Sequence, residues 1–197
     1  MSNRKVRYII LSFLKIFRFI FNRFSQQKLA TFGFEDYFQC VQLNDGSIIN
    51  LRIMDTAGQE QFFSINDKYY KIAECCLLVY DITKKDSFDQ IIEDYIPKIK
   101  EKCYKDTKII LLGNKADLKE EREVEDKEGS KLAEENGYIF MESSCKDNYN
   151  VSDAFTALVE ITNNDFKRSN TISRSHSRSL LSIKETAQVK KKTCCKK

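Results

Sequence analysis

The chain has 197 residues with a formal net charge of +4, a length that fits one domain plus tails. Its seven cysteines include two adjacent pairs and no Cys-x-x-Cys spacing, which argues against a disulfide framework and against a zinc site. Lys and Arg are concentrated in residues 167–197, where Glu185 is the single acid. A basic tail of this kind indicates an anionic partner, either a membrane surface or a nucleic acid.

The first half of the chain predicts one helix and two strands. Residues 8–24 are apolar around most of a helical surface, which implies burial or membrane contact, but the run is short for a bilayer span. Residues 37–43 and 48–54 predict strands. Asn44-Asp45-Gly46 predicts the hairpin turn between them.

The second half alternates strands with helices. Continuous or short apolar runs predict strands over residues 75–80, 108–112 and 138–142. Helical spacing predicts helices over 87–103 with a kink at Pro97, over 125–136 closed by Gly137, and over 151–164 with Ser152 as cap. This alternation predicts an α/β doubly wound sheet, and residues after 167 are polar enough to form a disordered linker.

Residues that bind ligands follow several of these strands, at the edge where α/β sheets hold their ligands. The four segments are Thr31-Phe32-Gly33, Asp55-Thr56-Ala57-Gly58-Gln59, Asn114-Lys115-Ala116-Asp117 and Ser144-Cys145-Lys146. A carboxylate or a threonine hydroxyl can hold Mg²⁺, and a glycine lets backbone N–H groups approach a phosphate. A single carboxylate can accept two hydrogen bonds from a base with adjacent N–H groups, as guanine has. Each segment alone is weak support for a site.

Taken together, the order and intervals of these segments resemble the guanine-nucleotide-binding boxes of small GTPases. The resemblance implies a three-layer α/β fold of the P-loop NTPase type with a mostly parallel central sheet. It implies GTP or GDP and Mg²⁺ as ligands, with Gln59 positioning a water molecule and Thr31 and Asp55 holding Mg²⁺. The nucleotide-binding residues that it implies are Thr31, Asp55, Ala57, Gly58, Asn114, Lys115, Asp117, Ser144, Cys145 and Lys146.

Finer features resemble the Rab branch of that family. Residues 61–65, 69–73 and 78–83 are similar to Rab stretches around the second switch and the strand after it. Cys194 and Cys195, followed by two lysines, resemble a Rab prenylation terminus. Two geranylgeranyl groups would supply the two signals that stable membrane anchoring needs. This interpretation divides the chain into an atypical hydrophobic and basic segment 1–16, a Rab-like domain 17–166 and a basic tail 167–197.

The phosphate-binding loop is where the sequence departs from that family. No GxxxxGK[ST] motif occurs in the chain. Counting back from Thr31 puts the first glycine of the loop at Val6, its lysine at Ser12 and its Mg²⁺-binding hydroxyl at Phe13. With five residues before Val6, we expect the first strand to be missing or replaced. Loss of three or four charge-assisted contacts would cost about 5–10 kcal/mol of binding, or roughly four to seven decades in affinity.

The sequence thus predicts a Rab-like GTP/GDP switch of vesicle trafficking and membrane transport, with nucleotide binding impaired. The alternative is a non-catalytic pseudo-GTPase that acts as a membrane-tethered interaction module. Whether residues 1–16 are authentic or come from a gene-model or splice artefact stays open. The expected partners are effectors, an exchange factor, an activating protein and a prenylation escort, with no nucleic acid. The expected state is a monomer, lipid-anchored on the cytoplasmic face of an endomembrane with a cytosolic pool.

Overall fold

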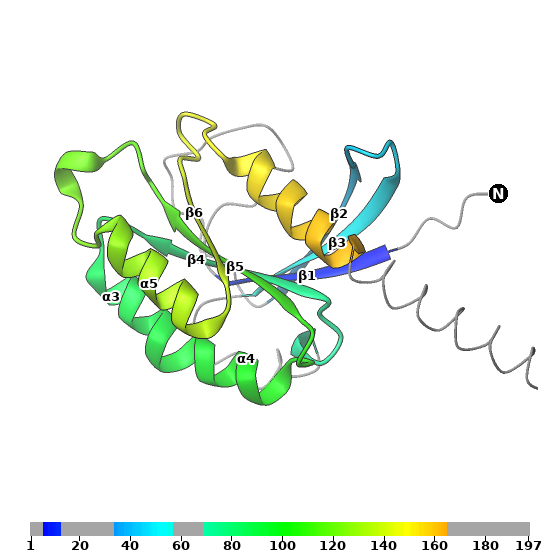
Figure 1. The fold of residues 1–197 in the computed structure, drawn as a ribbon, viewed down its shortest axis with the longest axis horizontal. Coiled ribbons are helices and arrows are strands. Elements are labelled where there is room, and N and C mark those ends of the chain that lie inside the picture. Colours follow the sequence, from blue (N-terminus) through cyan, green and yellow to red (C-terminus); the bar gives the residue numbers. More distant parts are fainter. Residues whose placement is uncertain (1–5, 13–33, 57–68, 165–197) are drawn as a thin grey trace, which may run out of the picture. The chain divides into compact units, whose positions relative to one another are not determined.

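The computed structural model describes residues 6–12, 34–56 and 69–164 (Figure 1). Those up to residue 162 lie in one compact unit, Met1–Thr162. The second unit, Asn163–Lys197, is described only at residues 163 and 164. The prediction of a disordered tail therefore falls outside the described residues.

A six-stranded sheet forms the centre of the first unit, in the order β2-β3-β1-β4-β5-β6. β3, β1, β4, β5 and β6 run parallel to one another, and β2 pairs antiparallel with β3. The strands are β1 (Val6–Ser12), β2 (Phe34–Gln42), β3 (Ile48–Thr56), β4 (Cys75–Asp81), β5 (Lys108–Asn114) and β6 (Ile139–Ser143). The mostly parallel sheet that the sequence predicted is confirmed, with boundaries that differ from the predicted ones by a few residues.

The first strand is present, and it occupies the centre of the sheet. β1 pairs with β3 on one side over its full length and with β4 on the other, so that Ser12 lies beside both Thr56 and Leu78. The prediction of a helix over 8–24 is therefore wrong for residues 8–12, and the first strand is not missing. β1 is formed by residues that the spacing assigned to the phosphate-binding loop, so the usual first strand is replaced. The rest of the predicted helix lies outside the described residues.

The hairpin between β2 and β3 turns where the sequence predicted. The amide of Gly46 donates to the carbonyl of Leu43, and the amide of Leu43 donates to the carbonyl of Ser47, each at 2.9 Å. Gly46 has φ +77°, a left-handed conformation that glycine adopts without steric cost. The pairing of Tyr37 with Ile53 then fixes the register of the two strands.

Two helical segments cover one face of the sheet. The first runs without interruption through α3 (Lys85–Gln90), the π turn η2 (Ile91–Tyr95) and α4 (Ile96–Lys102), and the second is α5 (Asp126–Asn136). Pro97 lies in the first turn of α4 directly after the π turn, so the disturbance predicted at this proline takes the form of a change in helix type. A short 3-10 turn, η3 (Lys119–Glu121), follows β5.

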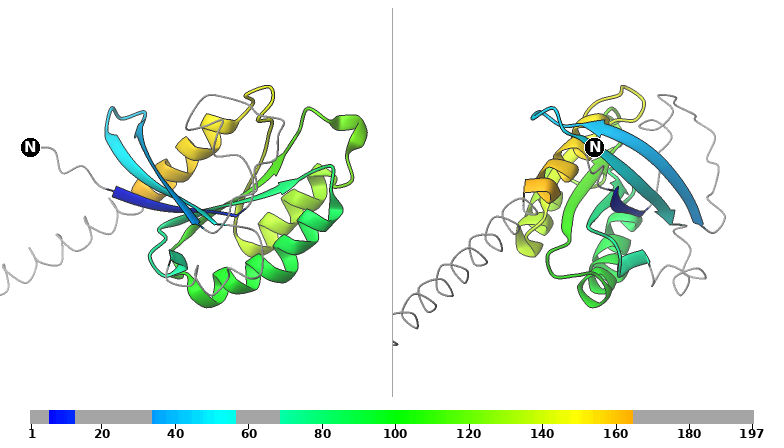
Figure 2. Two further views of the ribbon diagram at one scale, coloured as in Figure 1. Left: turned by 180° about the vertical axis from the view of Figure 1, so that it is seen from behind. Right: turned by 90° about the vertical axis from the view of Figure 1, so that its right-hand side faces the viewer.

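The helix that begins at residue 151 covers the opposite face with its residues up to 162, and the two layers are seen from several sides in Figures 1 and 2. Its residues Ala154, Phe155, Leu158 and Val159 share a core cluster with Leu77 and other residues of β3, β4 and β5. α3, α4 and α5 share the second cluster with Leu78, Tyr80 and Leu111. Because both faces of β4 are buried, its sequence is a continuous apolar run rather than an alternating one.

Helix ends follow the sequence signals at α5 but not at the last helix. Glu125 and Glu128 form a capping box at the start of α5, and Gly137 ends it in the left-handed conformation, as predicted. The last helix begins at residue 151, where the amide of Ala154 donates to the carbonyl of Asn150 at 3.1 Å. Asn150 therefore precedes the helix, and the prediction of Ser152 as its cap is wrong.

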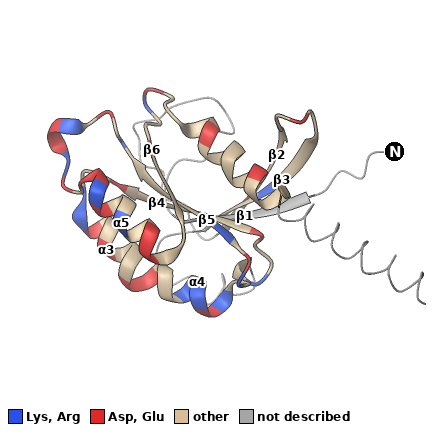
Figure 3. Ribbon diagram, viewed as in Figure 1, with Lys and Arg blue, Asp and Glu red and all other residues tan. Residues whose placement is uncertain are grey.

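Charged residues lie mainly on the helices and loops, while the central strands carry few of them (Figure 3). Among the residues that the structure describes, no helix is long and apolar enough to cross a membrane.

Candidate functional site

The carboxyl ends of β4, β5 and β6 bring the predicted base-binding segments together. Asp81, Asn114 and Ser143 end these three strands and lie side by side in the parallel ladder. Asn114 is 2% exposed, and its side-chain Oδ1 accepts a hydrogen bond from the amide of Cys145 at 3.4 Å. This hydrogen bond joins the end of β5 to the loop after β6.

The loop after β5 holds Asp117 against the loop after β6. Oδ1 of Asp117 accepts a hydrogen bond of 2.6 Å from the hydroxyl of Ser144, and Oδ2 lies 3.8 Å from Nζ of Lys146. The amide of Ala116 donates to the carbonyl of Ser143 at 3.0 Å. Each carboxylate oxygen has two acceptor sites, so Asp117 retains capacity for two donors of a base.

The loop after β6 is closed on itself. Ser144 and Tyr149 exchange two backbone hydrogen bonds, of 3.0 and 2.9 Å. The hydroxyl of Ser144 also accepts from the amide of Asp147 at 3.0 Å. Ser144 is 1% exposed. The sequence singled out Ser144 for its backbone position alone, whereas its side chain orients the carboxylate of Asp117, which was predicted to bind the base.

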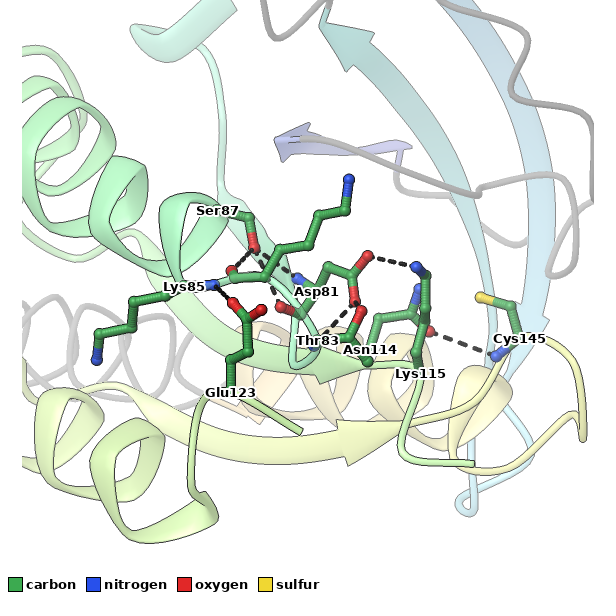
Figure 4. Close-up of polar contacts among 9 residues, drawn as sticks. Asp81, Thr83, Lys85, Ser87, Asn114, Lys115, Glu123 and Cys145 are labelled. Atoms are coloured by element: carbon green, nitrogen blue, oxygen red, sulfur yellow. Dashed lines mark hydrogen bonds and ion pairs between the residues drawn. The ribbon is translucent and has the colours of Figure 1, made fainter. Parts of the chain in front are cut away.

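Lys115 is held by a residue that the sequence did not single out. Its ammonium group lies 2.5 Å from Oδ2 of Asp81, at the end of the neighbouring strand (Figure 4). Lys115 has φ +70°, an uncommon conformation for a residue with a side chain. The ion pair and this backbone conformation fix the path of the lysine stem that was predicted to cover the base.

Asp81 is itself enclosed by hydrogen bonds. Its Oδ1 accepts from the amide of Thr83 at 3.1 Å and from the Thr83 hydroxyl at 2.7 Å. The amide of Asp81 donates to the hydroxyl of Ser87 at 3.0 Å. Burial raises the pKa of Asp81, but the hydrogen bonds from Lys115 and Thr83 outweigh it, and the pKa lies below its ordinary value. An acid followed two residues later by threonine, directly after a buried strand, is the sequence signal for this turn.

Two glutamates and one arginine connect the elements on this side of the molecule. The guanidinium of Arg122 makes a bidentate contact with the carboxylate of Glu142, at 2.6 and 2.9 Å. Glu123 accepts from the amide of Lys85 at 2.7 Å, and the amide of Glu123 donates to the carbonyl of Ile82 at 2.9 Å. These contacts join the segment before α5 to β6 and to the turn after β4.

The residues predicted to hold phosphate and Mg²⁺ are described only in part. Asp55 lies next to the last residue of β3, with its backbone paired to Leu11 of β1 and Glu35 of β2. The predicted residues outside the described part of the chain are Thr31, Ala57, Gly58, Gln59, Cys194 and Cys195. The structure therefore brings together Asn114, Lys115, Asp117, Ser144, Cys145 and Lys146, and it places the Asp55 backbone at the same edge of the sheet.

Comparisons with known proteins identify the family of the chain. The Ras family pattern matches residues 13–164, beginning directly after β1. The chain is 48% identical to Ras-related protein Rab-26 of Rattus norvegicus over 116 residues, which cover 59% of this chain and 45% of that protein. It is 42% identical to Ras-related protein Rab-8A of Bos taurus over 143 residues, 73% of this chain and 68% of that one. It is 39% identical to Ras-related protein RABA6a of Arabidopsis thaliana over 142 residues, 72% and 60%.

The chain therefore belongs to the Ras family. Within that family its similarities are to Rab proteins, and it is a small GTPase of the Rab type. The matches span 45–68% of the length of these three relatives.

Proposed function

We propose that this chain is a Rab-type guanine-nucleotide switch of intracellular vesicle trafficking and membrane transport, with a complete guanine subsite and a weakened phosphate subsite. The observation that carries the proposal is Asp117, held by Ser144 at the carboxyl ends of β5 and β6. The similarity to Rab proteins supports the switch rather than a non-catalytic interaction module.

Guanine fits the residues around Asp117. The base presents two adjacent N–H donors, and the carboxylate presents two oxygens whose orientation is set by the Ser144 hydroxyl. Lys115, fixed by Asp81, would cover one face of the base with its stem. The amide of Cys145 donates to Asn114 through a long bond of 3.4 Å, so it would have to share its hydrogen with the oxygen of the base. The lone pairs of Asp117 therefore account for most of the base selectivity.

The phosphates and Mg²⁺ fit less well. The oxygens of Thr31 and Asp55 are ligands of the kind that Mg²⁺ prefers. The lysine and the second hydroxyl of the usual loop are absent, because the positions that would supply them are Ser12 and Phe13. Ser12 is the last residue of β1, within the sheet ladder. Gln59 is the residue that the resemblance to small GTPases assigns to the attacking water, but no hydrolysis step follows from the residues present.

Membrane attachment completes the proposal. Cys194 and Cys195 would carry geranylgeranyl groups, and Lys190, Lys191 and Lys192 would add attraction to anionic lipid. This would place a monomer on the cytoplasmic face of an endomembrane, with a cytosolic pool bound to a prenylation escort. Effectors, an exchange factor and an activating protein of the Rab kind would be its other partners.

A competition experiment tests the guanine subsite. Fluorescent mantGDP is titrated with the purified chain up to the highest soluble protein concentration, and unlabelled GDP or ADP is then added. The proposal predicts displacement by GDP and not by ADP, and loss of binding in Asp117→Ala. Equal displacement by both nucleotides, or unchanged binding in Asp117→Ala, would contradict it. Circular dichroism of the variant controls for folding.

A further inference from the structure

Two cysteines from different elements meet on one face of the sheet. Cys75 and Cys76 are neighbours on β4, so their side chains point to opposite faces. Cys75 belongs to the core cluster that includes the last helix, whereas Cys76 belongs to the cluster under α3, α4 and α5. Cys103 packs against this second cluster. Cys76 and Cys103 therefore share a face, and Cys75 lies on the other.

The backbone brings Cys103 over the beginning of β4. α4 ends at Lys102, and the amide of Cys103 caps it by donating to the carbonyl of Ile99. The chain then returns to β5, where the amide of Lys108 donates to the carbonyl of Glu74 at 3.2 Å. The hydroxyl of Thr107 donates to the carbonyl of Ala73 at 3.3 Å. These contacts hold the segment after α4 against the segment before β4, and Cys103 packs against the cluster to which Cys76 belongs.

The two thiols differ in exposure and acidity. Cys76 is buried, whereas Cys103 is partly exposed. The hydrogen bond from Cys76 lowers the pKa of Cys103, although burial opposes it. The same hydrogen bond, together with burial, raises the pKa of Cys76. A partly exposed thiol with a lowered pKa beside a buried thiol with a raised pKa is the arrangement of a redox-sensitive pair.

We propose that Cys76 and Cys103 form a reversible disulfide when the protein meets a peroxide. The Cys103 thiolate attacks one oxygen of hydrogen peroxide, the O–O bond breaks, and a sulfenic acid forms while hydroxide leaves. The sulfur of Cys76 then attacks the sulfenic sulfur, and its proton combines with the departing hydroxide as water. Two thiols and one peroxide thus yield one disulfide and two waters, and a dithiol reductant reverses the change.

The bond would join the amino end of β4 to the carboxyl end of α4. Asp81 lies at the other end of β4, so the guanine subsite is not part of the link. Closing a covalent loop between residues 76 and 103 restricts the unfolded chain, and the oxidised protein should unfold at a higher temperature than the reduced one.

Peroxide treatment of the full chain, followed by alkylation of free thiols and peptide mapping, tests the proposal. We expect a linked peptide joining the segment with Cys75 and Cys76 to the segment with Cys103, with a mass loss of about 2 Da that dithiothreitol reverses. Cys75→Ser should keep this link, and Cys103→Ser should abolish it. Because Cys103 is partly exposed, its replacement by serine leaves the core filled, and thermal unfolding checks the fold of each variant.

Three outcomes would overturn the proposal. In the first, Cys103 is oxidised beyond the sulfenic acid without forming a link. In the second, Cys103 links to Cys40, Cys145 or a cysteine of the tail. In the third, the link is lost in Cys75→Ser, which would place the bond on the wrong face of β4.

Discussion

The proposed guanine side and the proposed phosphate side of this molecule lie at one edge of the sheet but differ in how well their residues suit a nucleotide. On the guanine side, the loops after β5 and β6 hold each other through Asp117, Ser144 and Asn114. On the phosphate side, β1 lies between β3 and β4. Its residues, however, are those that the spacing assigned to the phosphate-binding loop. The same residues cannot form both the central strand and the phosphate-binding loop, and in this chain they form the strand.

The largest loss of stability is expected from a substitution that disrupts β1. Ile10 lies in the middle of β1 and is paired to Met54 and to Cys76. Ile10→Pro removes a ladder donor in a central strand, which should cost about 3 kcal/mol or more and unfold the domain. Ile10→Val keeps the donor and serves as control. Urea unfolding followed by circular dichroism measures the difference, and near-equal stability of the two variants would show that β1 does not complete the sheet.

A smaller loss of stability is expected from a substitution in α5. A Cβ atom added at Gly129 of α5 would lie 2.5 Å from the hydroxyl of Tyr80 and 2.5 Å from a ring carbon of Phe140. Gly129→Ala should therefore destabilise the fold by about 1–3 kcal/mol, even though alanine favours a helix.

The matched control is Ser130→Ala, at the next position of α5, where the side chain is exposed. Thermal unfolding of the two variants separates packing from helix propensity. A rise in the unfolding temperature of Gly129→Ala would mean that α5 does not approach β4 and β6 this closely.

Base selectivity should change without a comparable change in stability when Asp117 is altered. Asp117→Asn replaces one carboxylate oxygen with an amide donor, which suits a base that carries a carbonyl where guanine carries its amino group. We expect guanine binding to weaken by about 1–3 kcal/mol and xanthine binding to strengthen relative to it. Competition between GDP and XDP against mantGDP measures this, and an unchanged preference would exclude Asp117 from the base contact.

The smallest effect expected is a pH-dependent one at Asp81. Its pKa in the folded protein is lowered, so its contribution to stability is present above the unfolded pKa of about 4 and is lost as pH falls through the folded value. Asp81→Asn should cost about 1–2 kcal/mol at pH 7, and its stability should fall less than that of the parent protein below pH ~4. Urea unfolding at several pH values checks this, and parallel stability curves would contradict the role given to Asp81.

Sequence reasoning placed the residues of the proposed guanine side at neighbouring strand ends, as the structure has them, because the signals for these strands are local. Asn114 ends β5, Asp117 follows β5 and Ser144 follows β6, and parallel strands bring such residues to one edge. Gly46 and Gly137 marked a turn and a helix end because both need a left-handed backbone.

The strand β1 and the contact of Asp81 with Lys115 could not be predicted in the same way. Val6–Ser12 continues into further apolar residues, and a long apolar run does not distinguish a buried strand from a helix. These residues form a strand because the sheet has a position for one between β3 and β4. Asp81 and Lys115 are distant in sequence, and their contact depends on the register of β4 with β5.

We infer that most of the binding energy of a guanine nucleotide comes from contacts with the guanine and little of it from contacts with the phosphates. Calorimetric titration of the full chain with guanosine and with GDP, each with Mg²⁺ and with EDTA, tests this directly. The account predicts dissociation constants for the two ligands within about tenfold of each other and no dependence on Mg²⁺. Binding of GDP that is more than about a thousandfold tighter than binding of guanosine, and that EDTA abolishes, would contradict it.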